Sequence, residues 1–138
     1  MIYQNTRGMT LEIREHGCYF MSLINLAIRY TQQTITPMEI VARFREFKNA
    51  GYIGTDSYII NPEMILKKMG FSAEYVGKFP AGYNTKPNQA EILLFRNGEI
   101  DHFVVGDGKG HVSYDPWAPH SQTATYGELI GKRIFNIP

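Results

Sequence analysis

The chain has 138 residues, of which 43% are hydrophobic and 20% are charged, and its formal net charge is +1 at pH 7. This length predicts a single domain over residues 1–138. The near-neutral charge argues against nucleic acid as a partner, and no apolar run reaches the about 18 residues of a membrane span, so no membrane partner is expected. With no signal-peptide pattern at the start and one cysteine in the chain, a reducing cytoplasm is the expected compartment.

The first half of the chain carries helical patterns. Residues 17–30 predict an amphipathic helix, because apolar side chains recur at helical spacing at Phe20, Leu23, Ile24, Ala27 and Ile28. A second helix is expected from Pro37 to about Lys48, with Thr36 as its N-cap. A third should begin at Asn61-Pro62 and end before Gly70.

Beyond Gly70 the pattern changes to short runs rich in β-branched and aromatic residues, which predict strands. These runs lie at 72–76, 90–95, 102–106, 111–115 and 133–137. Asn97-Gly98 predicts a hairpin turn between the second and third strands, and Tyr126–Ile130 suggests one turn of helix. Helices followed by antiparallel strands indicate an α+β fold.

Cys18 is the only cysteine, and it is either a packed small hydrophobe or a nucleophile. No second Cys or His pair has the spacing of metal ligands, so neither a metal nor another cofactor is expected. The position favours a nucleophile, because the dipole and the unpaired N–H groups at a helix start stabilise a thiolate.

A nucleophilic thiol needs a base with an orienting partner, and the second half of the chain offers a candidate pair. If a hairpin turn centres on Gly108-Lys109, Asp107 pairs with Gly110, and His102 then lies directly across from Asp115. Opposite residues have Cβ atoms about 4.5–5.5 Å apart, which permits an imidazole–carboxylate hydrogen bond. The same register gathers apolar residues on the other face, namely Phe103, Val105, Val112 and Tyr114. The plainer alternative is a structural histidine beside a strand-ending Asp-Pro turn.

Three segments in this order resemble the papain-like cysteine peptidases, most closely the bacteriocin-leader-processing (double-glycine) peptidase group. They are Gly17-Cys18-Tyr19-Phe20, Asp101–Gly106 and Val112–Trp117. A fainter similarity is to small uncharacterised domains of bacterial phage and prophage proteins. The resemblance implies a papain-like fold, with N-terminal helices packed on a C-terminal antiparallel sheet. It also implies that Cys18 is the nucleophile, His102 the general base and Asp115 the residue that orients it.

The resemblance also identifies a position for the oxyanion donor. The family usually has a glutamine about six residues before the cysteine, and Glu12 stands at that position here, while the only upstream glutamine is Gln4. An ionised carboxylate would repel the oxyanion, and losing one such donor costs about 10²–10³ in rate. The backbone N–H of Cys18 would remain, and further candidate donors are Asn5, Arg14 and His16.

Two functions therefore stay open. The first is a thiol hydrolase that cleaves a peptide or related amide through Cys18, His102 and Asp115, with a peptide or protein as its substrate. The second is a catalytically inactive papain-like domain that binds a peptide or partner protein in the same cleft. Glu12 at the expected oxyanion position motivates the second.

Overall fold

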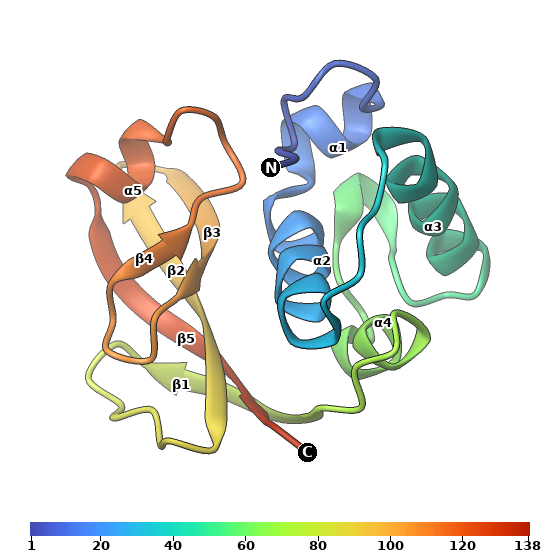
Figure 1. The fold of residues 1–138 in the computed structure, drawn as a ribbon. Helices are drawn as coiled ribbons and strands as arrows, with labels where there is room; N and C mark the ends of the chain where they lie inside the picture. The colour runs from blue at the N-terminus through green and yellow to red at the C-terminus, as the bar shows by residue number, and fades with distance from the viewer.

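The fold has one helical layer and one sheet layer, and the computed structural model describes residues 1–138. In Figure 1, α2 (Cys18–Thr31) lies between the sheet and α3 (Pro37–Asn49). Because the sheet is entirely antiparallel and follows most of the helices in the chain, the expected α+β class is confirmed.

The helices begin where the capping residues predict. The remaining helical elements are α1 (Leu11–His16), the 3-10 turn η1 (Thr55–Ser57), α4 (Pro62–Lys68) and α5 (Gln122–Tyr126). Thr36 caps α3 by accepting the N–H of Glu39, and Asn61 caps α4 by accepting that of Met64. These caps satisfy N–H groups that have no partner within their own helices.

Two features of the helical pattern differ from expectation. Helix α1 has only six residues between its cap Thr10 and Gly17, which is too short to show an apolar period. The helical turn expected at Tyr126–Ile130 is wrong, because α5 ends at Tyr126 and Glu128 already pairs with Arg96 of the neighbouring strand. Tertiary pairing outweighs local preference in this segment.

Five strands form the sheet in the order β1-β5-β2-β3-β4. Their bounds are β1 (Glu74–Pro80), β2 (Gln89–Asn97), β3 (Ile100–Gly106), β4 (Val112–Tyr114) and β5 (Glu128–Asn136). The predicted hairpin at Asn97-Gly98 is confirmed: Asn97 pairs with Ile100, and Gly98 has a φ of 63°. The strand that carries His102 therefore lies between β2 and β4.

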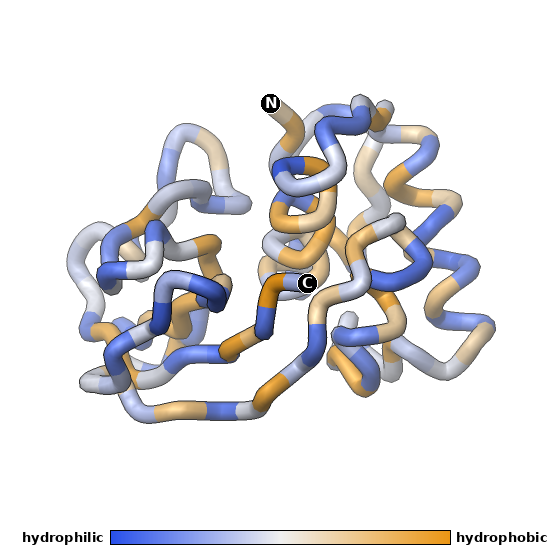
Figure 2. Tube along the Cα trace, turned by 60° about the horizontal axis from the view of Figure 1, so that its bottom comes forward, coloured by the Kyte–Doolittle hydropathy of each residue, from blue (hydrophilic) through white to orange (hydrophobic).

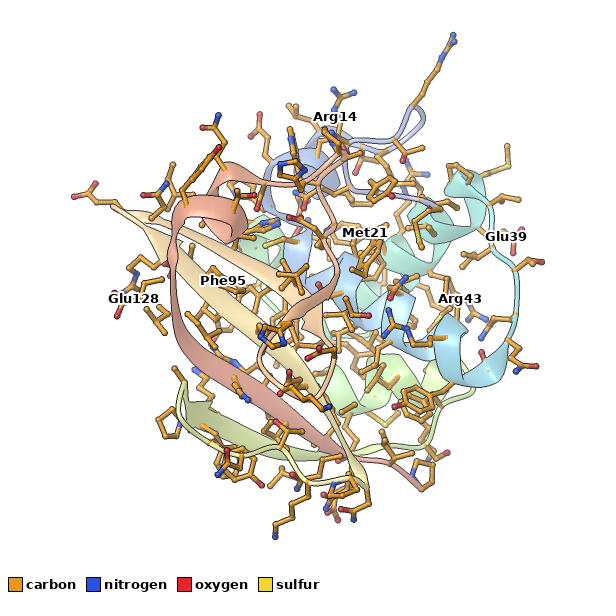
Figure 3. All side chains as sticks on the ribbon, turned by 60° about the vertical axis from the view of Figure 1, so that its left-hand side comes forward. Arg14, Met21, Glu39, Arg43, Phe95 and Glu128 are labelled. Carbon is orange, nitrogen blue, oxygen red and sulfur yellow. The ribbon has the colours of Figure 1, made fainter.

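The core lies mainly between the helices and one face of the sheet. A cluster of 23 buried residues fills this space, and a second cluster of Leu93, Phe95 and Val104 lies on the other face. In Figure 3, Met21 of α2 lies in the middle of the molecule and Glu39 of α3 at its periphery. Along α3, at the right of Figure 2, hydrophobic and hydrophilic stretches alternate, as expected for a helix with one buried face.

A buried ion pair ties the sheet to the glycine-rich β3–β4 connection. Lys132 Nζ lies 2.9 Å from Glu91 Oε1, and the two residues are 3% and 1% exposed. Glu91 Oε2 also accepts the N–H groups of Gly108 and Gly110, at 3.0 and 2.9 Å. A Cβ atom at Gly106 would collide with this carboxylate. The glycines thus leave room for the Glu91 carboxylate inside the loop between β3 and β4.

Candidate active site

Cys18 is placed at the junction of two helices. It is the first residue of α2 and directly follows Gly17, whose N–H donates to Ile13 O of α1 at 2.8 Å. A Cβ atom at Gly17 would come within 2.5 Å of that same oxygen, so only glycine permits this approach. The Cys18 thiol is free and partly exposed, and its backbone N–H has no partner within α2.

Contacts beside Cys18 fix α2 against β3. Tyr19 stacks on Phe103, with ring centroids 4.5 Å apart and planes 22° apart. Ser22 Oγ donates to Cys18 O at 2.8 Å and lies 3.4 Å from Phe103 O. Because these contacts involve the chain neighbours of Cys18 and His102, they place the two side chains in the lining of one cavity.

His102 and Asp115 form a buried pair. His102 Nε2 lies 2.7 Å from Asp115 Oδ1, and the residues are 7% and 8% exposed. Asp115 also accepts the N–H groups of Trp117 at 2.9 Å and Ser121 at 2.7 Å. With Nε2 engaged by the carboxylate, Nδ1 is the ring nitrogen left to exchange a proton with Cys18.

The electrostatics of the pair favour its charged form. Burial alone would lower the pKa of His102, but the hydrogen bonds and charges of Asp115 and Cys18 outweigh it and raise the pKa to about 9. Burial would raise the pKa of Asp115, but hydrogen bonds from His102, Ser121 and Trp117 outweigh it and lower that pKa. At neutral pH the arrangement is therefore an imidazolium held by a carboxylate.

The predicted contact between His102 and Asp115 is present, but the predicted hairpin register is wrong. Val105 pairs with Tyr114, a bulge follows, and the loop closes through Asp107 N–H to His111 O at 2.9 Å. Because the loop is longer than predicted, Tyr114 pairs with Val105 rather than with Phe103, a shift of two residues. Since side chains alternate with a period of two, Asp115 keeps its face, and His102 reaches it diagonally rather than directly across.

Two cavities meet at Cys18. The first, which we call the polar cavity, has a volume of about 690 Å³, and its lining includes Gln4, Arg14, Cys18, His102, Trp117 and His120. The second, which we call the tyrosine groove, has a volume of about 460 Å³, and its lining includes Cys18, Tyr19, Tyr58, Tyr75, Lys78 and Arg133. A ligand that crosses Cys18 can therefore contact both cavities.

Glu12 does not lie at an oxyanion site. Its carboxylate lies 2.6 Å from Lys48 Nζ and accepts the Ser57 N–H at 3.0 Å. Burial raises its pKa, but the Lys48 and Ser57 contacts outweigh it, so the pKa is lowered. Glu12 therefore anchors η1 to α1, and it lines neither the polar cavity nor the tyrosine groove.

Gln4, the sole glutamine upstream of Cys18, lines the polar cavity together with Cys18 and His102. Its backbone N–H donates to Pro116 O at 2.8 Å, and its side-chain nitrogen donates to Arg14 O at 3.0 Å. The same nitrogen also donates to Ile13 O at 3.5 Å, a long contact, so one of its two N–H donors is only weakly held. The only sequence signal for this residue was its being the sole upstream glutamine.

The other candidate donors are placed differently. Asn5 exchanges two hydrogen bonds with Ala118, at 3.0 and 3.1 Å, and so holds the loop after Asp115 against the N-terminal segment. Arg14 lines the polar cavity. His16 lines the tyrosine groove and lies 3.9 Å from Asp56.

The family model described as "Protein of unknown function, DUF261" matches residues 1–137. The chain therefore belongs to this family. No curated protein and no solved structure matches the chain. Within the structure, no three His, Cys, Asp or Glu side chains converge in a way that could hold a metal ion. None of the helices is both long and apolar enough to cross a membrane.

Proposed function

We propose that the chain is a thiol hydrolase of papain-like fold that cleaves a peptide or a related amide. One arrangement carries the proposal: Cys18 at the start of α2 lines the same cavity as His102, and His102 Nε2 lies 2.7 Å from Asp115 Oδ1. A nucleophile, a base and an orienting carboxylate in this order form a catalytic triad.

The chemistry has two balanced steps. His102 holds the proton of the Cys18 thiol as an imidazolium, and the thiolate sulfur attacks the amide carbonyl carbon, forming a C–S bond. The tetrahedral intermediate collapses as the C–N bond breaks, and the imidazolium gives its proton to the leaving amine. A water molecule then attacks the thioester, with His102 as base, and releases the carboxylic acid and the thiol.

Two N–H donors are suited to the oxyanion. The backbone N–H of Cys18 points from a helix start, where the helix dipole favours negative charge. The side-chain amide of Gln4 lines the same cavity and is neutral, so it does not repel the oxyanion. In this proposal Gln4 takes the role that the sequence position had suggested for Glu12.

The proposal includes a papain-like fold. It is supported by an arrangement in which a cysteine opens a helix, that helix packs on an antiparallel sheet, and a histidine lies near the start of a strand. The motif resemblance to the bacteriocin-leader-processing peptidase group points the same way. A nucleophilic free thiol suits a reducing compartment, so we place the activity in the cytoplasm.

The competing function, an inactive binding domain, rested on a carboxylate at the oxyanion site. Glu12 binds Lys48 and Ser57 instead, at 2.6 and 3.0 Å. That observation no longer favours the inactive domain over the hydrolase.

Alkylation of Cys18 by iodoacetamide tests the nucleophile. Because Cys18 is the only cysteine, each modified chain gains one label at a known site. We expect the alkylation rate between pH 6 and 7 to exceed that of free cysteine, and His102→Gln to reduce it. A rate that rises with pH as it does for a free thiol, with a pKa of about 8.5, would contradict the proposal.

Hydrolysis of a mixed pool of fluorogenic peptide amides tests the reaction itself. We expect amine release by the parent protein and a loss of at least about 10³-fold in Cys18→Ala. Equal release by both proteins would show that the thiol has no part in the reaction. A parent protein that binds peptides without any turnover would instead establish the inactive binding domain.

A further inference from the structure

Two positively charged side chains face each other in the wall of the tyrosine groove. Lys78 of β1 and Arg133 of β5 are directly paired residues of antiparallel strands, and both line the groove that reaches Cys18. Like charges placed directly opposite each other destabilise a sheet. Neither side chain forms an ion pair within the chain.

A β-bulge turns Lys78 toward this groove. The register of β1 against β5 shifts between Tyr75 and Gly77, which leaves Val76 as an extra residue, and Gly77 has a φ of 137°. Because of that extra residue, Tyr75 and Lys78 lie on the same face although they are three positions apart. Bulges near functional sites commonly redirect a side chain in this way.

The groove around the two cations is apolar and begins beside the reactive atoms. The Arg133 guanidinium lies over the Phe103 ring, 5.2 Å from its centroid, and Phe103 directly follows His102. At the rim, Tyr58 and Ile60 are 67% and 56% exposed. Large exposed apolar side chains around a concave surface with a few charged groups are typical of ligand sites.

The remaining charged groups of the groove do not cancel the two cations. Asp56 is the one carboxylate in the lining, and it lies 3.9 Å from His16, which also lines the groove. The wall formed by β1 and β5 is thus positive and has no counter-charge of its own. Charge complementarity therefore calls for an anion on the ligand.

We propose that the tyrosine groove receives an acidic side chain of a peptide substrate, with its carboxylate between Lys78 and Arg133. An adjacent apolar residue of the same peptide packs against Tyr19 and Phe103. This inference rests on the proposed function in that the peptide crosses Cys18. A chain that presents an internal amide to Cys18 continues into both cavities, so the carboxylate comes from a side chain rather than from the peptide's C-terminus.

Peptide binding to Cys18→Ala tests the inference without turnover. The probes are fluorescein-labelled octapeptides with a C-terminal amide, each with one Phe and with Glu scanned over the neighbouring positions, and a matched series with Gln in place of Glu. A third series has Gln and a free C-terminal carboxylate. Fluorescence anisotropy gives the affinities at two salt concentrations. In the same Cys18→Ala background, the variants are Lys78→Gln, Arg133→Gln and their combination, with exposed Lys67→Gln as the control away from both cavities.

We expect the best Glu peptide to bind about tenfold more tightly than its Gln partner. This preference should fall in either single variant, vanish in the double variant, weaken with salt and persist in Lys67→Gln.

Equal affinities for Glu and Gln peptides, absence of binding by all peptides, or a preference only for the free C-terminus would each overturn the inference. Charge-selective binding without hydrolysis by the parent would leave the inference standing and remove the proposed hydrolase. Hydrolysis without a preference for Glu peptides would support the hydrolase and overturn the inference about the tyrosine groove.

Discussion

Tyr19 and Phe103 stack with ring centroids 4.5 Å apart, and they are the chain neighbours of Cys18 and His102. The rings belong to α2 and β3, so the contact joins the helical layer to the sheet where the candidate nucleophile and base meet. The distance between sulfur and imidazole therefore depends on an aromatic contact within the core rather than on a surface loop. Aromatic pairs of this kind contribute about 0.5–1.5 kcal/mol beyond the area that they bury.

Removing the Tyr19 ring should impair the site more than it impairs the fold. In Tyr19→Leu, we expect the alkylation rate of Cys18 at pH 6.5 and any peptide hydrolysis to fall by about 10²-fold, since a displacement of about 1 Å has that effect on catalysis. Tyr19→Phe, which keeps the ring, should retain both. The measurements are alkylation kinetics and thermal unfolding.

The same helix offers a matched control for this change. Tyr30, near the other end of α2, stacks on Phe71 with centroids 4.6 Å apart and planes 5° apart. Tyr30→Leu removes a similar stacking contact, lowers stability by less because Tyr30 is 44% exposed, and should leave the alkylation rate unchanged. If both leucine variants slow alkylation equally, the Tyr19 contact has no special role in placing the thiol.

Asp115→Asn should lower the pKa of His102 from about 9 toward its ordinary value of about 6.5. The loss of the carboxylate charge removes one of the two partners that favour imidazolium, while the Cys18 contact remains. NMR titration of the imidazole in both proteins measures the shift. A His102 pKa that does not change would mean that Asp115 does not act on the ring in solution.

The raised pKa of His102 also predicts how stability depends on pH. A pKa raised in the folded state contributes stability that is fully present below the unfolded value of about 6.5 and is lost as pH rises through about 9. Urea unfolding should therefore separate the parent from Asp115→Asn most clearly near pH 6, and the gap should narrow toward pH 10. A gap that widens above pH 9 would contradict the assignment.

Gln4→Ala should separate oxyanion stabilisation from thiol reactivity. Losing one oxyanion donor lowers amide hydrolysis by about 10²–10³-fold. Alkylation by iodoacetamide forms no oxyanion, so its rate should stay near that of the parent, which also reports that the site is still folded. Glu12→Gln, at the position that sequence reasoning had favoured, should retain hydrolysis because Glu12 lines neither cavity. A large loss in Glu12→Gln and none in Gln4→Ala would reverse the two assignments.

Local signals were sufficient for most elements of this fold. Thr36 and Asn61 cap the helices that they were expected to cap, and Asn97-Gly98 turns the predicted hairpin. Each of these features depends on neighbouring residues only, which is why the sequence reveals it. Helix α1 was not predicted, because six residues are too few to show a helical period. The segment after Tyr126 was predicted as helix, although pairing with a neighbouring strand makes it part of the sheet.

The candidate site was predictable in part, for a different reason. A register shift of two residues leaves each side chain on the same face of the sheet. The contact between His102 and Asp115 was therefore predicted correctly although the predicted register was wrong. No periodicity could bring Gln4 to Cys18, because the N-terminal segment is placed by tertiary hydrogen bonds such as Gln4 N–H to Pro116 O. Glu12 was considered only because the family that the motifs resemble usually has its oxyanion glutamine about six residues before the cysteine.

Breaking the ion pair between Glu91 and Lys132 should be among the most damaging single changes outside the site. Glu91→Gln leaves the Lys132 ammonium buried without a counter-charge, which costs about 3–5 kcal/mol in the free energy of unfolding. Replacing both residues, as Glu91→Leu with Lys132→Met, should cost less than the two single changes added together. Urea unfolding at pH 7 measures the parent, Glu91→Gln, Glu91→Leu, Lys132→Met and the double variant. Asp101→Asn, which removes an exposed pair with Arg96, serves as the control and should change stability little.

The pH dependence of this pair follows from the carboxylate. Burial raises the pKa of Glu91, but hydrogen bonds from Lys132, Thr85 and the Gly110 N–H outweigh it and lower the pKa. A pKa lowered in the folded state contributes stability that is present above the unfolded value of about 4.3 and is lost as pH falls through the folded value. The stability difference between the parent and Glu91→Gln should therefore hold from pH 7 to about 5 and shrink below pH 4. If the difference stayed constant down to pH 2, the carboxylate charge would not be what stabilises the loop and the sheet.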